Sequence, residues 1–105
     1  MKKLIKKISP AIMDSHKIRI RLEDGDMLLV HPHIVVRRKK GEEILKTMLE
    51  NGDCLDIPLS KISGVSVMPE SFAINVHCLH FNHHEYELVF PTREDLLALD
   101  SASVK

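Results

Sequence analysis

The chain has 105 residues, equal numbers of basic and acidic side chains, and no tryptophan. This length supports one domain with one hydrophobic core. Aromatic residues are only 4% of the chain, so few side chains are available to stack on the bases of single-stranded nucleic acids. No segment is apolar over a length that predicts a transmembrane helix or the apolar region of a signal peptide.

The charge is unevenly distributed along the chain. Residues 1–40 contain eleven Lys and Arg against four Asp and Glu, a net charge of +7. Residues 41–105 contain four against eleven, a net charge of −7. This asymmetry indicates either an anionic partner or two halves that neutralise each other in the folded domain.

Residues 1–16 form a basic N-terminal segment. Leu4, Ile5, Ile8 and Ile12 have helical spacing among lysines. Pro10 is expected to limit this helix to about two turns. The segment would lie on a membrane surface as a peripheral contact, pack on the domain, or fray.

Residues 17–30 predict a β-hairpin. Apolar Ile18, Ile20 and Leu22 alternate with charged side chains, which is the pattern of a strand with one buried face. Asp24-Gly25 supplies the turn, and residues 27–30 begin the second strand. His31-Pro32-His33 then interrupts with a turn, a bulge or a sheet edge, and a turn is expected.

Residues 42–50 are predicted to form a helix, because Ile44, Leu45, Met48 and Leu49 share one helical face. The alternative is a hairpin around Asn51-Gly52. Further along the chain, two short strands are expected within residues 54–68, with a kink at 60–64. A long strand at 72–81 is expected to pair with 86–90 in a last hairpin, and a helix with Thr92 as its N-cap follows.

These elements predict an α+β domain over residues 17–100, followed by a tail at 101–105. The fold class is a small antiparallel barrel or curled sheet of about six or seven strands, with a C-terminal helix and, as one alternative, the helix at 42–50. Both cysteines lie among strand-forming residues without a metal-binding or disulfide spacing. We therefore expect buried free thiols and a cytoplasmic location.

The segments LEDGDMLLV, HIVVRRKKG, IPLSKISGVSV and YELVF together resemble bacterial pleckstrin-homology-like domains, roughly over residues 17–100. The resemblance implies a non-enzymatic binding or assembly module. A helix at 42–50 would be an insertion in that family. The hairpin at 17–30 lacks the longer basic loop of the phosphoinositide-binding members, so lipid headgroup binding is not implied.

The stretch KIRIRLEDG is also similar to the start of Sm-like RNA-binding barrels, where it follows a short N-terminal helix. The glycine and asparagine of the Sm loops are absent, and the chain is longer than that barrel requires. This second resemblance implies nucleic-acid binding by a ring of about six or seven copies.

The histidines are the candidate metal ligands. His31 and His33 would share one strand face, which suits chelation, but cations rather than a carboxylate follow them. In HCLHFNHHEYE, residues 77–87, strand alternation sends His77 and His80 to opposite faces. The predicted hairpin pairs His80 with Glu87. The candidate ligands are therefore His31, His33, His80, His83 and His84.

Two more classes of site are considered. Basic side chains on neighbouring strands form a candidate anion or nucleic-acid surface: Lys17, Arg19, Arg21, Arg37, Arg38, Lys39 and Lys40. Catalysis is not predicted, because no nucleophile elbow or glycine-rich phosphate loop is present. Alternation also separates Cys78 from His77 and His80, which argues against a thiolate–imidazole pair.

The sequence therefore predicts a non-enzymatic module without a cofactor, which binds a protein partner or self-associates. The alternatives are a nucleic-acid-binding protein that uses the basic surface and a histidine-based metal-binding protein. Seven histidines also leave room for a response to pH between about 5 and 7.

Overall fold

The computed structural model of the chain describes residues 2–39 and 41–92. Within these ranges helix α1 (Lys2–Asp14) precedes the strands, and the short 3₁₀ helices η1 (Leu59–Lys61) and η2 (Val76–Leu79) lie between later ones. None of these helices is long and apolar enough to cross a membrane. The strands are β1 (His16–Leu22), β2 (Met27–Arg38), β3 (Glu43–Leu49), β4 (Cys54–Pro58), β5 (Ile62–Ser71) and β6 (Tyr86–Phe90).

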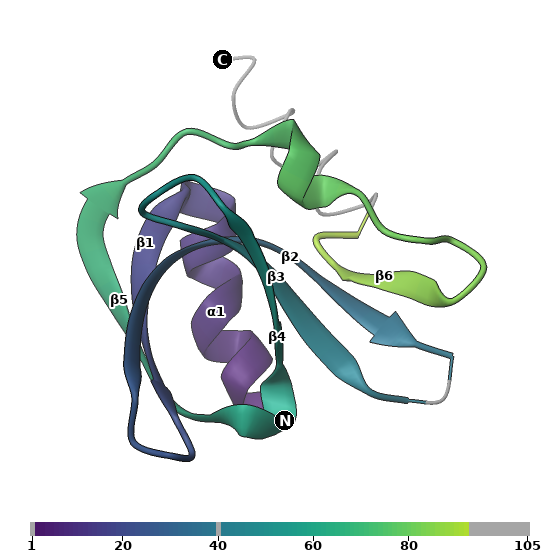
Figure 1. The fold of residues 1–105 in the computed structure, drawn as a ribbon, viewed down its shortest axis with the longest axis horizontal. Helices are drawn as coiled ribbons and strands as arrows, with labels where there is room; N and C mark the ends of the chain where they lie inside the picture. Colours follow the sequence, from purple (N-terminus) through teal and green to yellow (C-terminus); the bar gives the residue numbers. More distant parts are fainter. Residues whose placement is uncertain (1, 40, 93–105) are drawn as a thin grey trace.

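The six strands form one open antiparallel sheet, as the predicted fold class requires in outline. The strand order is β4-β3-β2-β1-β5, and β6 pairs with the C-terminal part of β2. β2 therefore has β3 along one edge and β1 and β6, end to end, along the other (Figure 1). The helix expected after Thr92 lies outside the described residues.

The hairpin predicted at 17–30 is confirmed. Ile18 pairs with Val30 and Ile20 with Leu28. Gly25 has a φ of 94°, which only glycine adopts without strain at this turn. The backbone N–H of Asp26 donates to the Asp24 carboxylate at 2.9 Å, which closes the turn.

Strand β2 continues through His31-Pro32-His33, so the expected turn is wrong and the bulge is correct. In its pairing with β3, Pro32 lies opposite Thr47 and Ile34 opposite Lys46. His33 is therefore the extra residue of a β-bulge. A bulge accommodates a proline, which has no N–H to give to the ladder, without ending the strand.

The predicted helix at 42–50 is wrong, and the alternative hairpin around Asn51-Gly52 is confirmed. Residues 43–49 form β3, which pairs with both β2 and β4. Ile44 and Leu45 are buried in two different apolar clusters, one on each face of the strand. A helix presents one apolar face and would leave one of these clusters incomplete.

The last predicted hairpin is also wrong. Residues 72–81 contain no strand; they cross the sheet as an irregular segment that includes η2. The strand at 86–90 does form, but its partner is β2, with Leu88 opposite Val36 and Glu87 opposite Arg37. The predicted pairing of His80 with Glu87 therefore does not occur.

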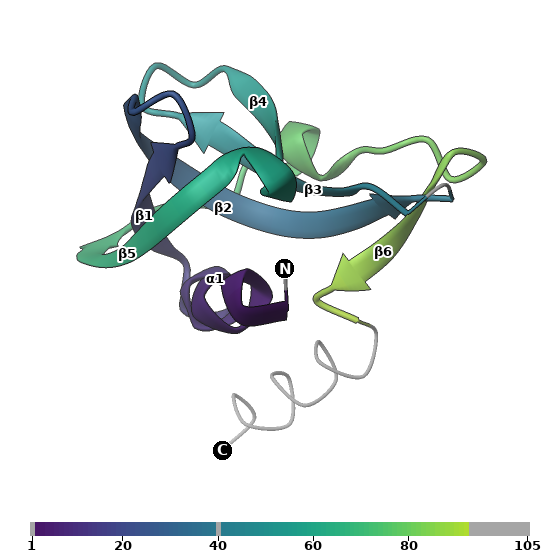
Figure 2. The same ribbon diagram turned by 90° about the horizontal axis from the view of Figure 1, so that it is seen from below.

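Helix α1 runs through Pro10 to Asp14, so the predicted limit of about two turns is wrong. Ile8, Ala11 and Ile12 are almost completely buried, and the helix packs against β1, β2 and β5 (Figure 2). Most helical stability in proteins comes from such packing of an apolar face, which here outweighs the backbone hydrogen bond that proline lacks. Packing on the domain is thus the correct alternative for this segment.

The sheet has an apolar cluster on each face. The main core joins α1 to the inward side chains of the sheet, among them Ile18, Ile20, Val35 and Leu45. The second cluster lies on the other face of β2 and β3 and consists of Ile34, Val36 and Ile44, with Leu79, Phe81 and Tyr86 packed against it.

A disulfide joins Cys54 at the start of β4 to Cys78 in η2, so the expected free thiols are wrong. The two residues are 24 positions apart, and their Cα atoms are 5.5 Å apart. The bond ties the irregular segment after β5 to the β3–β4 hairpin. Such disulfides persist in oxidising compartments, so the expected cytoplasmic location loses the support of the cysteines.

Candidate functional site

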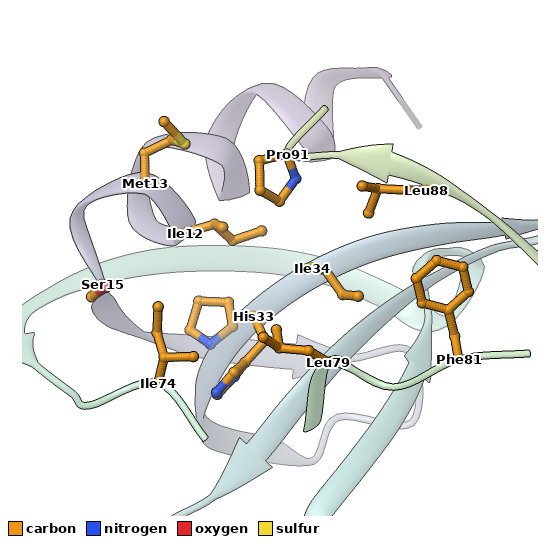
Figure 3. A pocket seen from close by; sticks show the side chains of 11 residues that line it. Ile12, Met13, Ser15, His33, Ile34, Ile74, Leu79, Phe81, Leu88 and Pro91 are labelled. Carbon is orange, nitrogen blue, oxygen red and sulfur yellow. The ribbon is translucent and has the colours of Figure 1, made fainter. Parts of the chain in front are cut away.

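An apolar pocket lies between the end of α1, the bulge of β2, the segment after β5 and the end of β6 (Figure 3). Its volume is about 310 Å³, the lower end of the range for ligand pockets. Ser15 and His33 are the polar residues of the wall. The lining residues are Ile12, Met13, Ser15, Pro32, His33, Ile34, Ile74, Leu79, Phe81, Leu88 and Pro91.

Among the described residues of this wall, His33 is the only titratable side chain. Its Nδ1 lies 2.8 Å from the carbonyl oxygen of His31, and the backbone N–H of Asn75 donates to its Nε2 at 3.0 Å. A carbonyl accepts and an amide donates, so Nδ1 carries the hydrogen and Nε2 carries a lone pair. The ring is therefore neutral, and a second proton would place two donors against each other.

The environment of His33 agrees with a neutral ring. Burial of the ring lowers the pKa of His33, the His31 carbonyl partly opposes that effect by raising it, and the His31 ring lowers it further. The ring also lies against Phe72, with the centroids 5.2 Å apart. His33 thus fixes residues 72–75 on the sheet through one hydrogen bond and one aromatic contact.

His31 belongs to a separate polar group at the start of the β3–β4 turn. Its Nε2 lies 3.1 Å from a carboxylate oxygen of Glu50, and Lys17 Nζ lies 3.0 Å from the same oxygen. Hydrogen bonds from Lys17 and then His31 lower the pKa of the Glu50 carboxyl. Phe72 stacks on the His31 ring at 4.9 Å. His31 thereby links three segments of the chain.

The candidate metal ligands are not brought together. His31 and His33 lie two residues apart on β2, but both nitrogens of His33 have hydrogen-bond partners. His80, His83 and His84 lie in the exposed loop between η2 and β6, where the His83 ring contacts Phe81. Across residues 2–39 and 41–92, no three His, Cys, Asp or Glu side chains are grouped to hold a metal ion.

The predicted basic surface is divided into two regions. Arg37 donates to Glu87 at 2.9 Å, and Arg38 lies 3.3 Å from Glu42, so both are already paired near the end of β2. Arg37 is seven residues beyond Val30, about 23 Å along an extended strand, which separates it from the basic residues of β1. Lys39 is exposed nearby, and Lys40 lies outside the described residues.

The second basic region is on β1. Lys17 is paired with Glu50, whereas Arg19 and Arg21 are exposed and form no ion pair with any described residue. They line a shallow recess of about 190 Å³ together with Lys7 of α1 and residues 64–66 of β5. Sequence reasoning missed Lys7, although the lysine-rich N-terminal helix was the signal that pointed to it.

The strands at the two ends of the β4-β3-β2-β1-β5 order differ in how their free edges are protected. β4 is five residues long, ends in Pro58, and has its Asp56 carboxylate paired with Lys46 at 3.0 Å. β5 is ten residues long; its residues 62–68 include no charged side chain, and Pro69 and Glu70 lie near its end. Val67 on this strand is 50% exposed. Among the described residues, β5 pairs with β1 and leaves its other edge unpaired.

Comparisons of the chain with protein-family models, curated proteins and solved structures found no match. The pocket, the basic recess and the free edge of β5 are the features of the described chain that can support a function.

The histidine geometry predicts a pH dependence of stability. The pKa of His33 is lowered in the folded state, so the unfolded chain binds a proton first as the pH falls. The stabilisation is complete above the unfolded pKa of about 6.5 and is lost below it, by at most about 1.4 kcal/mol per pH unit for one proton.

Urea unfolding between about pH 7.5 and about pH 5 measures this effect. We expect the free energy of unfolding to fall with pH in the wild-type chain and to fall less in His33→Gln, which cannot titrate. The exposed His83→Gln is the matched control and should keep the wild-type slope. Equal slopes in the His33 variant and the wild type would contradict the assignment.

Proposed function

We propose that this chain is a non-enzymatic self-association module that pairs through the free edge of β5. The unpaired backbone edge of β5 is the observation that supports this proposal. Natural sheets protect their outer strands with charges, prolines, bulges or short length, because unpaired backbone groups bind other strands. β5 has regular pairing with β1 from Val67 to Gly64 and no charged side chain in that stretch.

The partner edge determines the kind of assembly. Pairing of β5 with β5 of a second copy is isologous and gives a two-fold dimer. Pairing of β5 with β4 is heterologous, and it gives a closed ring or an open filament. β4 is the strand at the other end of the β4-β3-β2-β1-β5 order and can accept a partner, although Pro58 removes one of its donors.

The arrangement of the elements supports the Sm-like resemblance more than the pleckstrin-homology-like one. A helix directly before the first hairpin, as in α1 and β1, is what the Sm-like resemblance implies. The C-terminal helix that the other resemblance implies falls outside the described residues. A ring of about six or seven copies, formed by pairing of β4 with β5, would agree with the Sm-like resemblance.

Charge on the β5 edge tests this function. Val67→Lys places a cation in the middle of the regular pairing, where desolvation of the ammonium opposes a second strand. We expect the wild-type chain to be oligomeric by size-exclusion chromatography with light scattering, and Val67→Lys to be shifted toward the monomer by at least about tenfold in dissociation constant.

Val67→Thr is the matched control, because threonine is also β-branched and neutral and should keep the assembly. Circular dichroism of both variants shows whether they remain folded. A wild-type chain that stays monomeric at high concentration, or a Val67→Lys chain that assembles like the wild type, would refute the proposal.

A second function, contact with nucleic-acid phosphates, is supported by the basic recess. Lys7, Arg19 and Arg21 come from two elements, line one depression, and have no acidic partner among the described residues. Ser66 lies directly opposite Arg19, and Gly64 opposite Arg21, so small side chains leave space in front of the guanidinium groups. The recess borders β5, where assembly would place copies side by side.

Fluorescence anisotropy of a labelled single-stranded RNA at low and high salt measures this contact. We expect Arg19→Glu with Arg21→Glu to abolish salt-dependent binding, because both phosphate-neutralising charges are reversed. Arg37→Glu with Arg38→Glu is the matched control and should retain most binding, since those arginines are already paired. An equal loss of RNA binding in the two double variants would show that the recess is not the contact site. A wild-type chain that does not bind RNA would refute the nucleic-acid function.

A further inference from the structure

We propose that the apolar pocket is the docking site for the chain's own C-terminal segment, residues 93–105, with Leu96, Leu97 and Leu99 as the side chains that enter it. This inference is independent of the self-association through β5. It rests on the apolar wall of the pocket, on the place where the described chain ends, and on the sequence that follows.

The wall has the properties of a surface that another segment covers. Ile74 is 57% exposed and Leu88 39% exposed, and they project into the region between α1, β2 and β6 with Leu79 and Phe81 (Figure 3). Both nitrogens of His33 are already satisfied, so the wall offers a ligand little hydrogen bonding. An apolar occupant therefore fits better than a polar small molecule.

The described chain ends at the rim of this pocket. Pro91 is part of the wall, and Thr92 is the last described residue. Residues that follow so closely have an effective concentration at the pocket on the order of millimolar or higher, far above that of a separate protein in dilute solution. The segment is thus favoured over any external partner of equal intrinsic affinity.

The sequence of the segment matches the wall in chemistry and length. Leu96 and Leu99 are three residues apart and share one side of the predicted helix, and Leu97 lies beside them. In the predicted helix, the seven-residue step from Thr92 to Leu99 would span about 10 Å, which would keep the leucines close to Pro91. Glu94 lies on the side of the predicted helix opposite Leu96 and Leu99, where it would face water.

Methyl NMR on the full chain tests the docking. Ile12, Ile34 and Ile74 line the pocket, whereas Ile57 and Ile62 lie in the main core. We expect nuclear Overhauser effects between the first three isoleucines and the leucines at 96, 97 and 99. Replacement of the three leucines by serine should shift the pocket isoleucine signals, leave the two core isoleucines unchanged, and raise the fluorescence of an apolar dye severalfold.

Ala98→Ser with Ser101→Ala and Ser103→Ala is the matched control, and it should change neither the isoleucine signals nor dye binding. Wild-type spectra alone remain decisive if the leucine variant fails to fold. Absence of effects from the leucines to Ile12, Ile34 and Ile74 in the wild-type chain would overturn the proposal. Effects seen only between differently labelled copies would also overturn it, because a second molecule would then occupy the pocket.

Discussion

The fold depends on the pairing of one long strand, β2, along both of its edges. Residues 30–36 are buried without interruption, because β3 runs along one edge while β1 and then β6 occupy the other. Val35 faces the main core, and Ile34 and Val36 face the second cluster. Because β2 has apolar side chains on both faces, other elements must pack on each face of the sheet to exclude water.

Helix α1 covers one face of the sheet, and the irregular segment after β5 covers the other. Three contacts hold that segment in place: the Cys54–Cys78 disulfide, the hydrogen bond from Asn75 to His33, and the packing of Phe72 on His31. The pocket lies where the two coverings meet at the bulge of β2. The position of the pocket thus depends on the bulge, where Pro32 and His33 form part of its wall.

Local patterns predicted the elements whose partners are close in sequence. The alternation of Ile18 and Ile20 with charged residues, followed by Asp24-Gly25, specifies the first hairpin without help from the rest of the chain. Elements that depend on distant partners were predicted poorly. Ile44, Leu45, Met48 and Leu49 suit a helix or a strand equally, and only the pairing of β3 with β2 decides between them.

The candidate site was also predicted only in part, because some of its residues depend on partners that are distant in sequence. The exposed Arg19 and Arg21 follow from the alternation of β1, but their separation from Arg37 depends on how far β2 extends. Alternation around Leu79 and Phe81 predicted a strand, whereas these residues cover the second cluster as part of an irregular segment. No spacing rule pairs Cys54 with Cys78, because their proximity is a product of the complete fold.

The central claim is that β6 completes the edge of β2 and does not form a hairpin with the preceding segment. Backbone nuclear Overhauser effects across the sheet test this claim most directly. The structure predicts cross-strand effects between Val36 and Leu88 and between Arg37 and Glu87. Cross-strand effects between His80 and Glu87 and between Cys78 and Val89 would show the hairpin instead, and they would contradict the account.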